Sequence, residues 1–172
     1  YTTGYLAKLW NEQGQQVITQ KLIQTGNVDV SEDIQQHREI MGTGWLPEDE
    51  SKLTMPEIFS YPASPHLATK LDGREIDFAR IAAATRQLAE KFEVVLLEGA
   101  GGLMVPLTTE LLTIDYLEQK KFPVILVSSG RLGSINHTLL SLEALKARGL
   151  SLYALAYNLN DESQDPLISK DT

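Results

Sequence analysis

The sequence predicts an α/β fold in which a mainly parallel sheet carries helices on both faces. Predicted strands and helices alternate along the chain from end to end, and such alternation is typical of parallel sheets. The strands within residues 94–98 and 123–129 are continuously apolar before their polar ends, as expected for strands buried on both faces. A chain of 172 residues can bury one such core as a single domain.

Each predicted element has a local signal in the sequence. Apolar residues at helical spacing predict helices, and short apolar runs bounded by polar or turn-forming residues predict strands. In chain order, the predicted elements are helix 1–13, strand 15–23, helix 31–42, helix 76–92, strand 94–98, helix 113–121, strand 123–129, helix 134–149 and strand 152–158. Gly14 and Gly149 end the first and last helices, and Ser31 is the N-cap candidate of the second helix. Residues 43–66 carry four prolines and are expected to be mostly loop.

Composition and charge argue against several classes of function. The net charge of −8 argues against a nucleic-acid partner, because phosphate-backbone binding needs a basic face. A small nucleotide needs only a local cationic patch. No apolar run approaches the roughly 18 residues that a membrane helix requires, and the lack of cysteine excludes disulfides and thiolate metal sites. We therefore expect small-molecule ligands, no nucleic-acid partner and no membrane association.

The strand 94–98 ends in a carboxylate and is followed by a segment almost without side chains. Glu98 precedes residues 99–102, of sequence GAGG. Ligands of parallel sheets bind at the carboxyl ends of the strands, and the backbone amides of such a turn can approach an oxygen-rich ligand closely. A carboxylate beside phosphates is favourable when a hard cation lies between them, so Glu98 is a candidate Mg²⁺ ligand. An exposed glutamate in a tight turn explains this stretch equally well.

Other strand ends and helix starts carry further candidates. Lys21 can act as a fixed cation for a phosphate or a substrate carboxylate, or it is an ordinary surface lysine. Asp33 lies in the first turn of a predicted helix, where a negative charge is favourable without any metal. The free amides of residues 130–136, GRLGSIN, can bind an anion at a helix start or form a plain connecting turn. His66 and His137 are candidate bases, but neither has an evident partner, and both are expected to be structural.

Taken together, these stretches resemble the dethiobiotin synthetase family, which are P-loop ligases of biotin synthesis. The resemblance is carried by KLIQTG, SPH, EGAGGLMVPL, PVILVSSGRLGSINHTLLSLEAL and AYN, which span nearly the whole chain. It implies a P-loop NTPase-like, three-layer α/β/α fold. The 172 residues contain no GxxxxGK(S/T) loop. The resemblance predicts this loop immediately before Tyr1 and a further C-terminal segment, so we expect residues 1–172 to be a single domain that is incomplete at both ends.

The resemblance also implies a reaction and a set of residue roles. The family closes the ureido ring of dethiobiotin from 7,8-diaminononanoate and CO₂, through a carbamate that ATP phosphorylates. By position, Lys21 resembles the catalytic lysine, Asp33 and Glu98 resemble the Mg²⁺ ligands, and Thr25 stands where a hydroxyl contacts substrate. The remaining implied contacts are Asp33, Glu98, Gly99, Ala100, Gly101 and Asn158 for ATP, and Gly133 and Asn136 for the substrate carboxylate. Leu159 follows Asn158 where the family often has an acidic residue, so the resemblance leaves open whether the ligand contact of that acidic residue exists here.

The same resemblance implies a cytoplasmic homodimer in which the two subunits share each active site, with Asn136 facing the partner subunit. Two alternatives remain open. One is another P-loop ATPase or amidotransferase-like enzyme of the same fold, although a glutaminase cysteine is excluded because the sequence contains no cysteine. The other is a non-catalytic binding or regulatory domain derived from this fold. An intact phosphate-binding loop in the complete gene product would distinguish an enzyme from such a domain.

Overall fold

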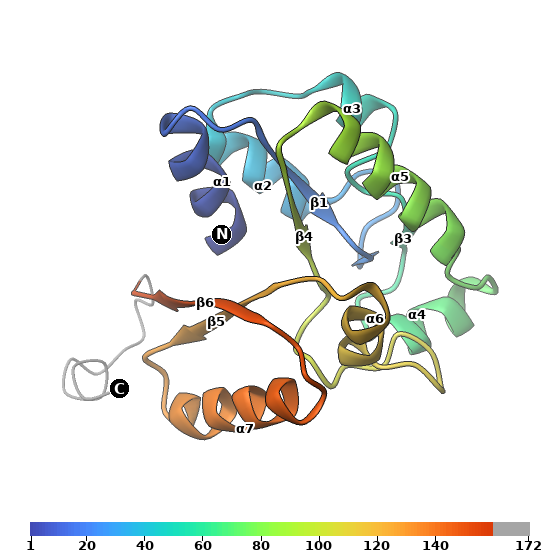
Figure 1. Ribbon diagram of the computed structural model, residues 1–172. Helices are drawn as coiled ribbons and strands as arrows, with labels where there is room; N and C mark the ends of the chain where they lie inside the picture. The colour runs from blue at the N-terminus through green and yellow to red at the C-terminus, as the bar shows by residue number, and fades with distance from the viewer. Residues whose placement is uncertain (160–172) are drawn as a thin grey trace. The chain divides into compact units, whose positions relative to one another are not determined.

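The computed structural model describes residues 1–159, which fall into two compact units. The first unit contains Tyr1 and Thr3–Leu111, and the second begins at Leu112. Figure 1 shows the helices and strands of both units along the chain. Parallel strand pairs with helices occur in each unit, which confirms the predicted α/β fold class.

The first unit is built on two pairs of parallel strands. β1 (Val17–Lys21) pairs with β4 (Val94–Glu98), in a register that sets Lys21 opposite Glu98. The short strands β2 (Gln24–Thr25) and β3 (Ile58–Phe59) form the second parallel pair. The helices of this unit are α1 (Thr2–Glu12), α2 (Glu32–Met41), α3 (Pro47–Glu50), α4 (Pro65–Asp72) and α5 (Phe78–Lys91).

Successive residues of β1 reach helices on opposite faces of the strand pair. Arg38 of α2 donates a 2.9 Å hydrogen bond to Oγ1 of Thr19, whereas Thr85 of α5 donates a 2.7 Å hydrogen bond to Oε1 of Gln20. Figure 1 accordingly shows β1 and β4 between α1 and α2 on one side and α5 on the other. Since side chains alternate along a strand, Lys21 follows Thr19 onto the face covered by α2. All five residues of β1 are buried.

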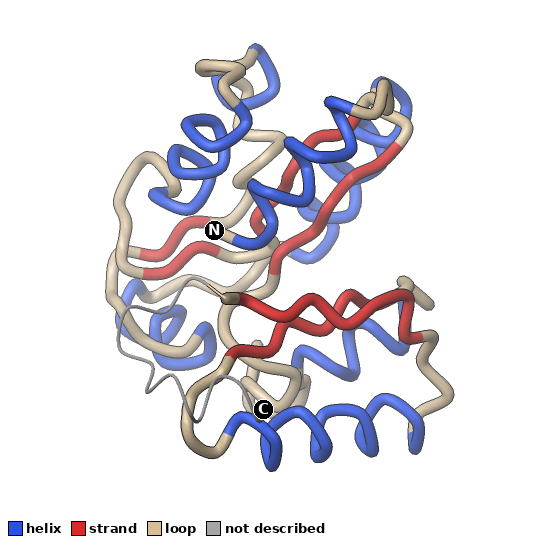
Figure 2. Tube along the Cα trace, turned by 90° about the vertical axis from the view of Figure 1, so that its left-hand side faces the viewer, coloured by secondary structure: helices blue, strands red, loops and turns tan. Residues whose placement is uncertain are grey.

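The described part of the second unit contains one parallel strand pair and a crossover helix. β5 (Val124–Ser129) pairs with β6 (Leu152–Asn158), so that Ser129 lies opposite Asn158. α6 (Thr113–Lys120) precedes β5, and α7 (Ser134–Ala147) connects the two strands. Figure 2 shows α7 running along this strand pair. Gly133 precedes α7 with a φ of 90°, in the left-handed region that favours glycine.

The prediction that residues 43–66 are mostly loop is confirmed. Short elements that were not predicted interrupt the loop: α3, β3 and the first residues of α4. Pro47 and Pro65 are the first residues of α3 and α4. Proline suits this position because its missing N–H has no partner there in any case and its φ is already close to helical. These prolines therefore begin helices instead of preventing them.

Each described strand pairs, through backbone hydrogen bonds, only with a strand of its own unit. The described strands form three two-stranded sheets, whereas the sequence led us to expect β1, β4, β5 and β6 in one sheet. The parallel direction of β1 with β4 and of β5 with β6 is as expected. The single-domain organisation stays a prediction. Among residues 1–159, no helix is both long enough and apolar enough to cross a membrane.

Candidate active site

Three charged side chains meet at the paired ends of β1 and β4. The Nζ atom of Lys21 lies 2.5 Å from Oδ2 of Asp33 and 2.8 Å from Oε1 of Glu98. It also donates a 3.1 Å hydrogen bond to the carbonyl oxygen of Gly99. The Lys21 side chain is 7% exposed, against 25% for Glu98 and 42% for Asp33. The site is therefore deep at the lysine and open to solvent at Asp33.

Strand register and helix position together build this arrangement. The β1–β4 register sets Lys21 beside Glu98, and the alternation of β1 directs Lys21 toward α2. Ser31 caps α2 through its side chain, which places Asp33 in the first turn of that helix. Asp33 consequently lies near the carboxyl end of the strand pair, where it contacts the same lysine as Glu98.

The second carboxylate oxygen of Glu98 faces two groups from helices. Its Oε2 accepts a hydrogen bond from the hydroxyl of Thr3 in α1 and lies 3.1 Å from Nε2 of His37 in α2. The contact with His37 is close but poorly aligned: in the described part of the chain, neither ring nitrogen of this fully buried histidine has a hydrogen-bond partner. We call Thr3, Lys21, Asp33, His37 and Glu98 the Lys21 cluster.

Thr3 and His37 were not among the site residues predicted from the sequence. A signal for His37 was present, because it follows Asp33 by four residues on α2 and residues at this spacing share one face of a helix. Thr3 has no comparable signal. Its contact with Glu98 depends on how α1 packs beside β4, which no local pattern in the sequence reports.

The charges of the Lys21 cluster stabilise one another. Burial lowers the pKa of Lys21, but the attraction of Glu98 and the hydrogen bonds to Asp33 and Glu98 outweigh it and raise this pKa above its ordinary 10.5. Burial likewise raises the pKa of Glu98, whereas the nearby His37 ring, Lys21 and Thr3 together hold it far below its usual range. Lys21 and Glu98 therefore both carry full charge at neutral pH.

Asp33 and Glu98 are suited to hold a magnesium ion. The two carboxylates lie close to each other, since one oxygen of each contacts the same Lys21 nitrogen. Mg²⁺ favours one or two carboxylates completed by phosphate oxygens and water. Within residues 1–159, no three or more His, Asp or Glu side chains are arranged around one metal position. The donor set thus fits a hard cation shared with a ligand, and not an all-protein cage of the kind that binds structural zinc.

The glycine-rich turn after Glu98 approaches the Lys21 cluster through its backbone. Gly99 supplies the carbonyl oxygen that Lys21 contacts. Gly101 has a φ of 81°, and a Cβ atom at this position would lie 3.0 Å from Cγ2 of Val105, so the turn requires glycine there. Thr25 ends β2 opposite Phe59. Within the described residues, no hydrogen bond or ion pair joins its side chain to the Lys21 cluster.

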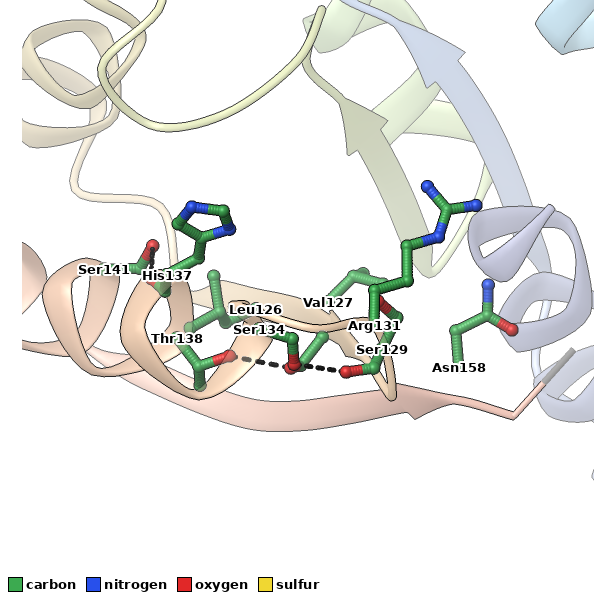
Figure 3. Close-up of a pocket in the computed structure, with 10 residues that line it drawn as sticks. Leu126, Val127, Ser129, Arg131, Ser134, His137, Thr138, Ser141 and Asn158 are labelled. Atoms are coloured by element: carbon green, nitrogen blue, oxygen red, sulfur yellow. Dashed lines mark hydrogen bonds between the residues drawn. The ribbon is translucent and has the colours of Figure 1, made fainter. Parts of the chain in front are cut away.

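The second unit contains a cavity of about 330 Å³ beside β5 and the start of α7 (Figure 3). Its walls carry the hydroxyl groups of Ser128, Ser129, Ser134, Thr138 and Ser141, and we call it the hydroxyl pocket. Figure 3 shows Arg131 and Asn158 at one end of this pocket and His137 on α7. Oγ of Ser128 lies 2.7 Å from Oγ1 of Thr138 and 3.3 Å from Oγ of Ser134.

The structure places the remaining predicted residues in different surroundings. Asn158 lines the hydroxyl pocket, whereas Gly133 and the exposed Asn136 are at the start of α7 and are not among its lining residues. His137 lines the pocket and is exposed. His66 lies in α4, where its Nδ1 is 3.0 Å from Oγ of Ser64, a local contact that agrees with the structural role expected for it.

Comparison with known proteins finds relatives over nearly the whole chain. A family model described as an AAA domain matches residues 2–170. The chain is 52% identical to the ATP-dependent dethiobiotin synthetase of Pasteurella multocida, over 99% of this chain and 79% of the relative. It is 51% identical to a protein of the same name from Haemophilus influenzae, over 98% and 88% of the two chains. A third such protein, from Chlorobaculum tepidum, is 50% identical over 95% of this chain and 68% of its own.

Proposed function

The chain belongs to the dethiobiotin synthetase family, and from this premise we propose that its complete gene product is an ATP-dependent ligase of biotin biosynthesis. The reaction adds CO₂ to an amine of 7,8-diaminononanoate to form a carbamate. ATP then phosphorylates the carbamate, and the second amine displaces phosphate to close the ureido ring. The observation that carries this proposal is the buried ammonium of Lys21, held between Asp33 and Glu98 at the ends of β1 and β4.

Lys21 supplies the fixed positive charge that this chemistry requires. Both the carbamate and the γ-phosphate of ATP are anionic, so the reaction depends on charge stabilisation and positioning more than on a covalent nucleophile. The raised pKa of Lys21, which its carboxylate neighbours cause against the opposing effect of burial, keeps it protonated throughout the working range of pH. Its fixed position means that little reorganisation is needed as charge develops on the substrates.

Asp33 and Glu98 are the residues that would hold Mg²⁺. A bound magnesium ion would neutralise phosphate charge on ATP. In this chain, Glu98 stays ionised because Lys21, Thr3 and the His37 ring favour its charged form. Asp33 is the more exposed of the two carboxylates, so it lies on the side open to an incoming nucleotide.

The other proposed contacts follow the family resemblance. Residues 99–101 would line the ATP site through their backbone, which the positive φ of Gly101 supports. Asn158 would contact the adenine base, and its position in the wall of a polar pocket supports a role in recognition. Thr25 would contact the diamine. We further propose that the enzyme acts in the cytoplasm.

Replacing Lys21 by glutamine tests the proposed function. In the complete gene product, we expect Lys21→Gln to lower turnover on the order of 10²–10³-fold, as loss of one preorganised charge-stabilising group typically does. Lys70→Gln, which removes an exposed lysine of α4, is the matched control and should retain turnover. Thermal unfolding would verify that both variants fold. Wild-type turnover in a folded Lys21→Gln variant would refute the assigned role.

We also propose that the enzyme is a two-fold symmetric homodimer in which Asn136 faces the partner subunit and binds the substrate carboxylate with Gly133. The first half of α7 supports an interface, because Ile135, Leu139 and Leu140 are 54%, 57% and 62% exposed. A two-fold dimer would bury the same apolar surface of both subunits. Free amides at the start of α7 also suit an anionic group.

Subunit mixing tests this shared site. Lys21→Gln and Asn136→Ala subunits should each be inactive alone, but a mixed dimer contains one site with both native residues. After equal mixing and exchange, about a quarter of all sites should be intact, since half of the dimers are mixed. The activity of the mixture should therefore rise toward about a quarter of the wild-type activity. If mixed dimers form, as native mass spectrometry would show, and no activity returns, the sites are not shared.

A further inference from the structure

His37 is a buried polar residue for which the family resemblance assigns no role. It lies in the second half of α2 with no solvent exposure. Within the described chain, neither of its ring nitrogens has a hydrogen-bond partner. Leaving a buried polar group unsatisfied costs about 1–3 kcal/mol, and such exceptions point to a functional or electrostatic requirement. The polar atom that Nε2 approaches is Oε2 of Glu98, at 3.1 Å.

The packing of α1 against α2 restricts where the His37 ring can lie. Gly4 of α1 faces it so closely that a Cβ atom at Gly4 would be 3.2 Å from Cα and 3.3 Å from Cδ2 of His37, and 3.1 Å from Cδ1 of Ile40. The ring therefore has little space to move toward α1. Because Thr3, next to Gly4, donates to the same Oε2 atom, the two helices together confine one side of the Glu98 carboxylate.

The two oxygens of Glu98 thus meet two different sets of neighbours. Oε1 contacts Lys21 at 2.8 Å, whereas Oε2 contacts Thr3 and faces the His37 ring. A carboxylate held on both oxygens keeps one orientation. When such a carboxylate is a metal ligand, the groups that hold it from behind set how well it binds the ion.

We infer that His37 is a positioning residue, whose Nε2–H is directed at Oε2 of Glu98 and fixes the carboxylate for the magnesium–ATP site. This inference rests on the proposed function, because it assigns His37 a purpose in the same site. His37 does not touch the substrates. It acts through Glu98, and its loss weakens magnesium-dependent nucleotide binding by about 10- to 100-fold, the usual effect of removing an outer-shell partner.

The test measures binding and not turnover. In the complete gene product, the readout is the Mg²⁺ concentration at which a non-hydrolysable ATP analogue is half bound, determined by calorimetry. His37→Leu should raise this concentration about 10- to 100-fold. His37→Gln places an amide N–H near the position of Nε2 and should stay within about threefold of wild type. His37→Asn places its amide near Nδ1 instead and should behave like His37→Leu.

Two further variants separate positioning from packing and from the proposed function itself. Ile40→Ala loosens the same contact with Gly4 without removing a polar group, so it should lower the melting temperature and leave the Mg²⁺ requirement unchanged. Glu98→Gln tests the metal site. If Glu98→Gln leaves the Mg²⁺ requirement unchanged, the proposed function fails. If Glu98→Gln raises it and a folded His37→Leu does not, only the inference about His37 fails.

A spectroscopic measurement on the wild-type protein keeps the inference testable even if the substitutions unfold α2. The nitrogen resonances of His37 should show a proton on Nε2, and Glu98→Gln should shift that resonance. A proton on Nδ1 alone would overturn the inference. So would equal effects of His37→Gln and His37→Asn on the Mg²⁺ requirement, because only the Nε2 position faces Glu98.

Discussion

At the paired ends of β1 and β4 the first unit gathers full charges, whereas at the paired ends of β5 and β6 the second unit gathers hydroxyl and amide groups. Lys21 and Glu98 form a close ion pair with little exposure. Ser128, Ser129 and Asn158 are neutral polar residues, and the one charged arginine of the described pocket lining, Arg131, lies at one end. Charges in a partly buried site interact strongly, while each neutral hydrogen bond contributes about 1 kcal/mol. The first arrangement suits stabilisation of developing charge, and the second suits recognition of a ligand's shape and hydrogen-bonding groups.

Two aspartates with similar local hydrogen bonds, one in each unit, differ in how deeply their ion pairs are buried. Asp49 and Asp115 each lie at the start of a helix and accept, at 2.8 Å, the backbone N–H of the residue three positions earlier. Each also pairs with an arginine. Asp49 and Arg38 are 0% and 3% exposed in the first unit, whereas Asp115 and Arg148 are 24% and 32% exposed in the second. The two aspartates make the same local hydrogen bond, but their ion pairs should contribute differently to the free energy of unfolding, because burial removes the solvent that screens a charge.

The largest expected effect separates these two aspartates. Asp49→Asn leaves the Arg38 guanidinium buried without a full counter-charge, so we expect the free energy of unfolding to fall by about 3–5 kcal/mol. Asp115→Asn should cost much less, since its pair with Arg148 is partly exposed and solvent screens it. Urea unfolding of both variants measures the difference. Equal losses would show that burial is not what distinguishes the two pairs.

An intermediate effect is expected in the hydroxyl pocket. Ser128 and Thr138 share a 2.7 Å hydrogen bond, which a cycle of Ser128→Ala, Thr138→Val and the double variant isolates. We expect a coupling of about 0.5–1.5 kcal/mol in the free energy of unfolding, as is typical of neutral pairs. A coupling well above this range would mean that the second unit also depends on strong polar interactions, which would remove the contrast with the first.

The smallest expected effect concerns acid stability. The hydrogen bond from Lys91 to Glu48, at 2.9 Å, holds the pKa of Glu48 below its ordinary 4.5 and outweighs the opposing effect of burial. A lowered folded-state pKa gives stability that is fully present above about pH 4.5 and is lost as pH falls through the folded value. Because the Lys91 side chain is 56% exposed, the contribution should stay below about 1 kcal/mol.

The Glu48→Gln variant tests whether the lowered pKa of Glu48 makes the protein lose stability in acid. Between pH 6 and pH 3, its free energy of unfolding should fall slightly less than that of wild type, while the exposed Glu90→Gln on α5 serves as the control. A steeper fall in Glu48→Gln than in wild type would contradict the direction of the pKa shift. A large difference would show that this pair, which is exposed on the Lys91 side only, behaves like the fully buried pair of Arg38 and Asp49.

Local sequence was enough to predict most elements and the candidates at the strand ends. Lys21 lies near the end of one predicted strand and Glu98 ends another, and the carboxyl end of a parallel strand is a property of chain direction. Ser31 marks the start of α2 because an N-cap is a local hydrogen bond. The prolines of residues 43–66 correctly indicated a region that is mostly loop, but they did not reveal that Pro47 and Pro65 begin α3 and α4, since proline is compatible with both a loop and the first turn of a helix.

Contacts between distant residues came only from the tertiary structure. Lys21 and Glu98 are 77 residues apart, so their ion pair depends on the register of β1 with β4. His37 shares a helix face with Asp33, but its approach to Glu98 depends on how α2 packs against the β1–β4 pair. Likewise, no local pattern distinguishes Asp49 from Asp115. Burial is set by what packs over a residue from elsewhere in the chain, and this is the quantity that turns similar polar residues into an ionic site or a surface contact.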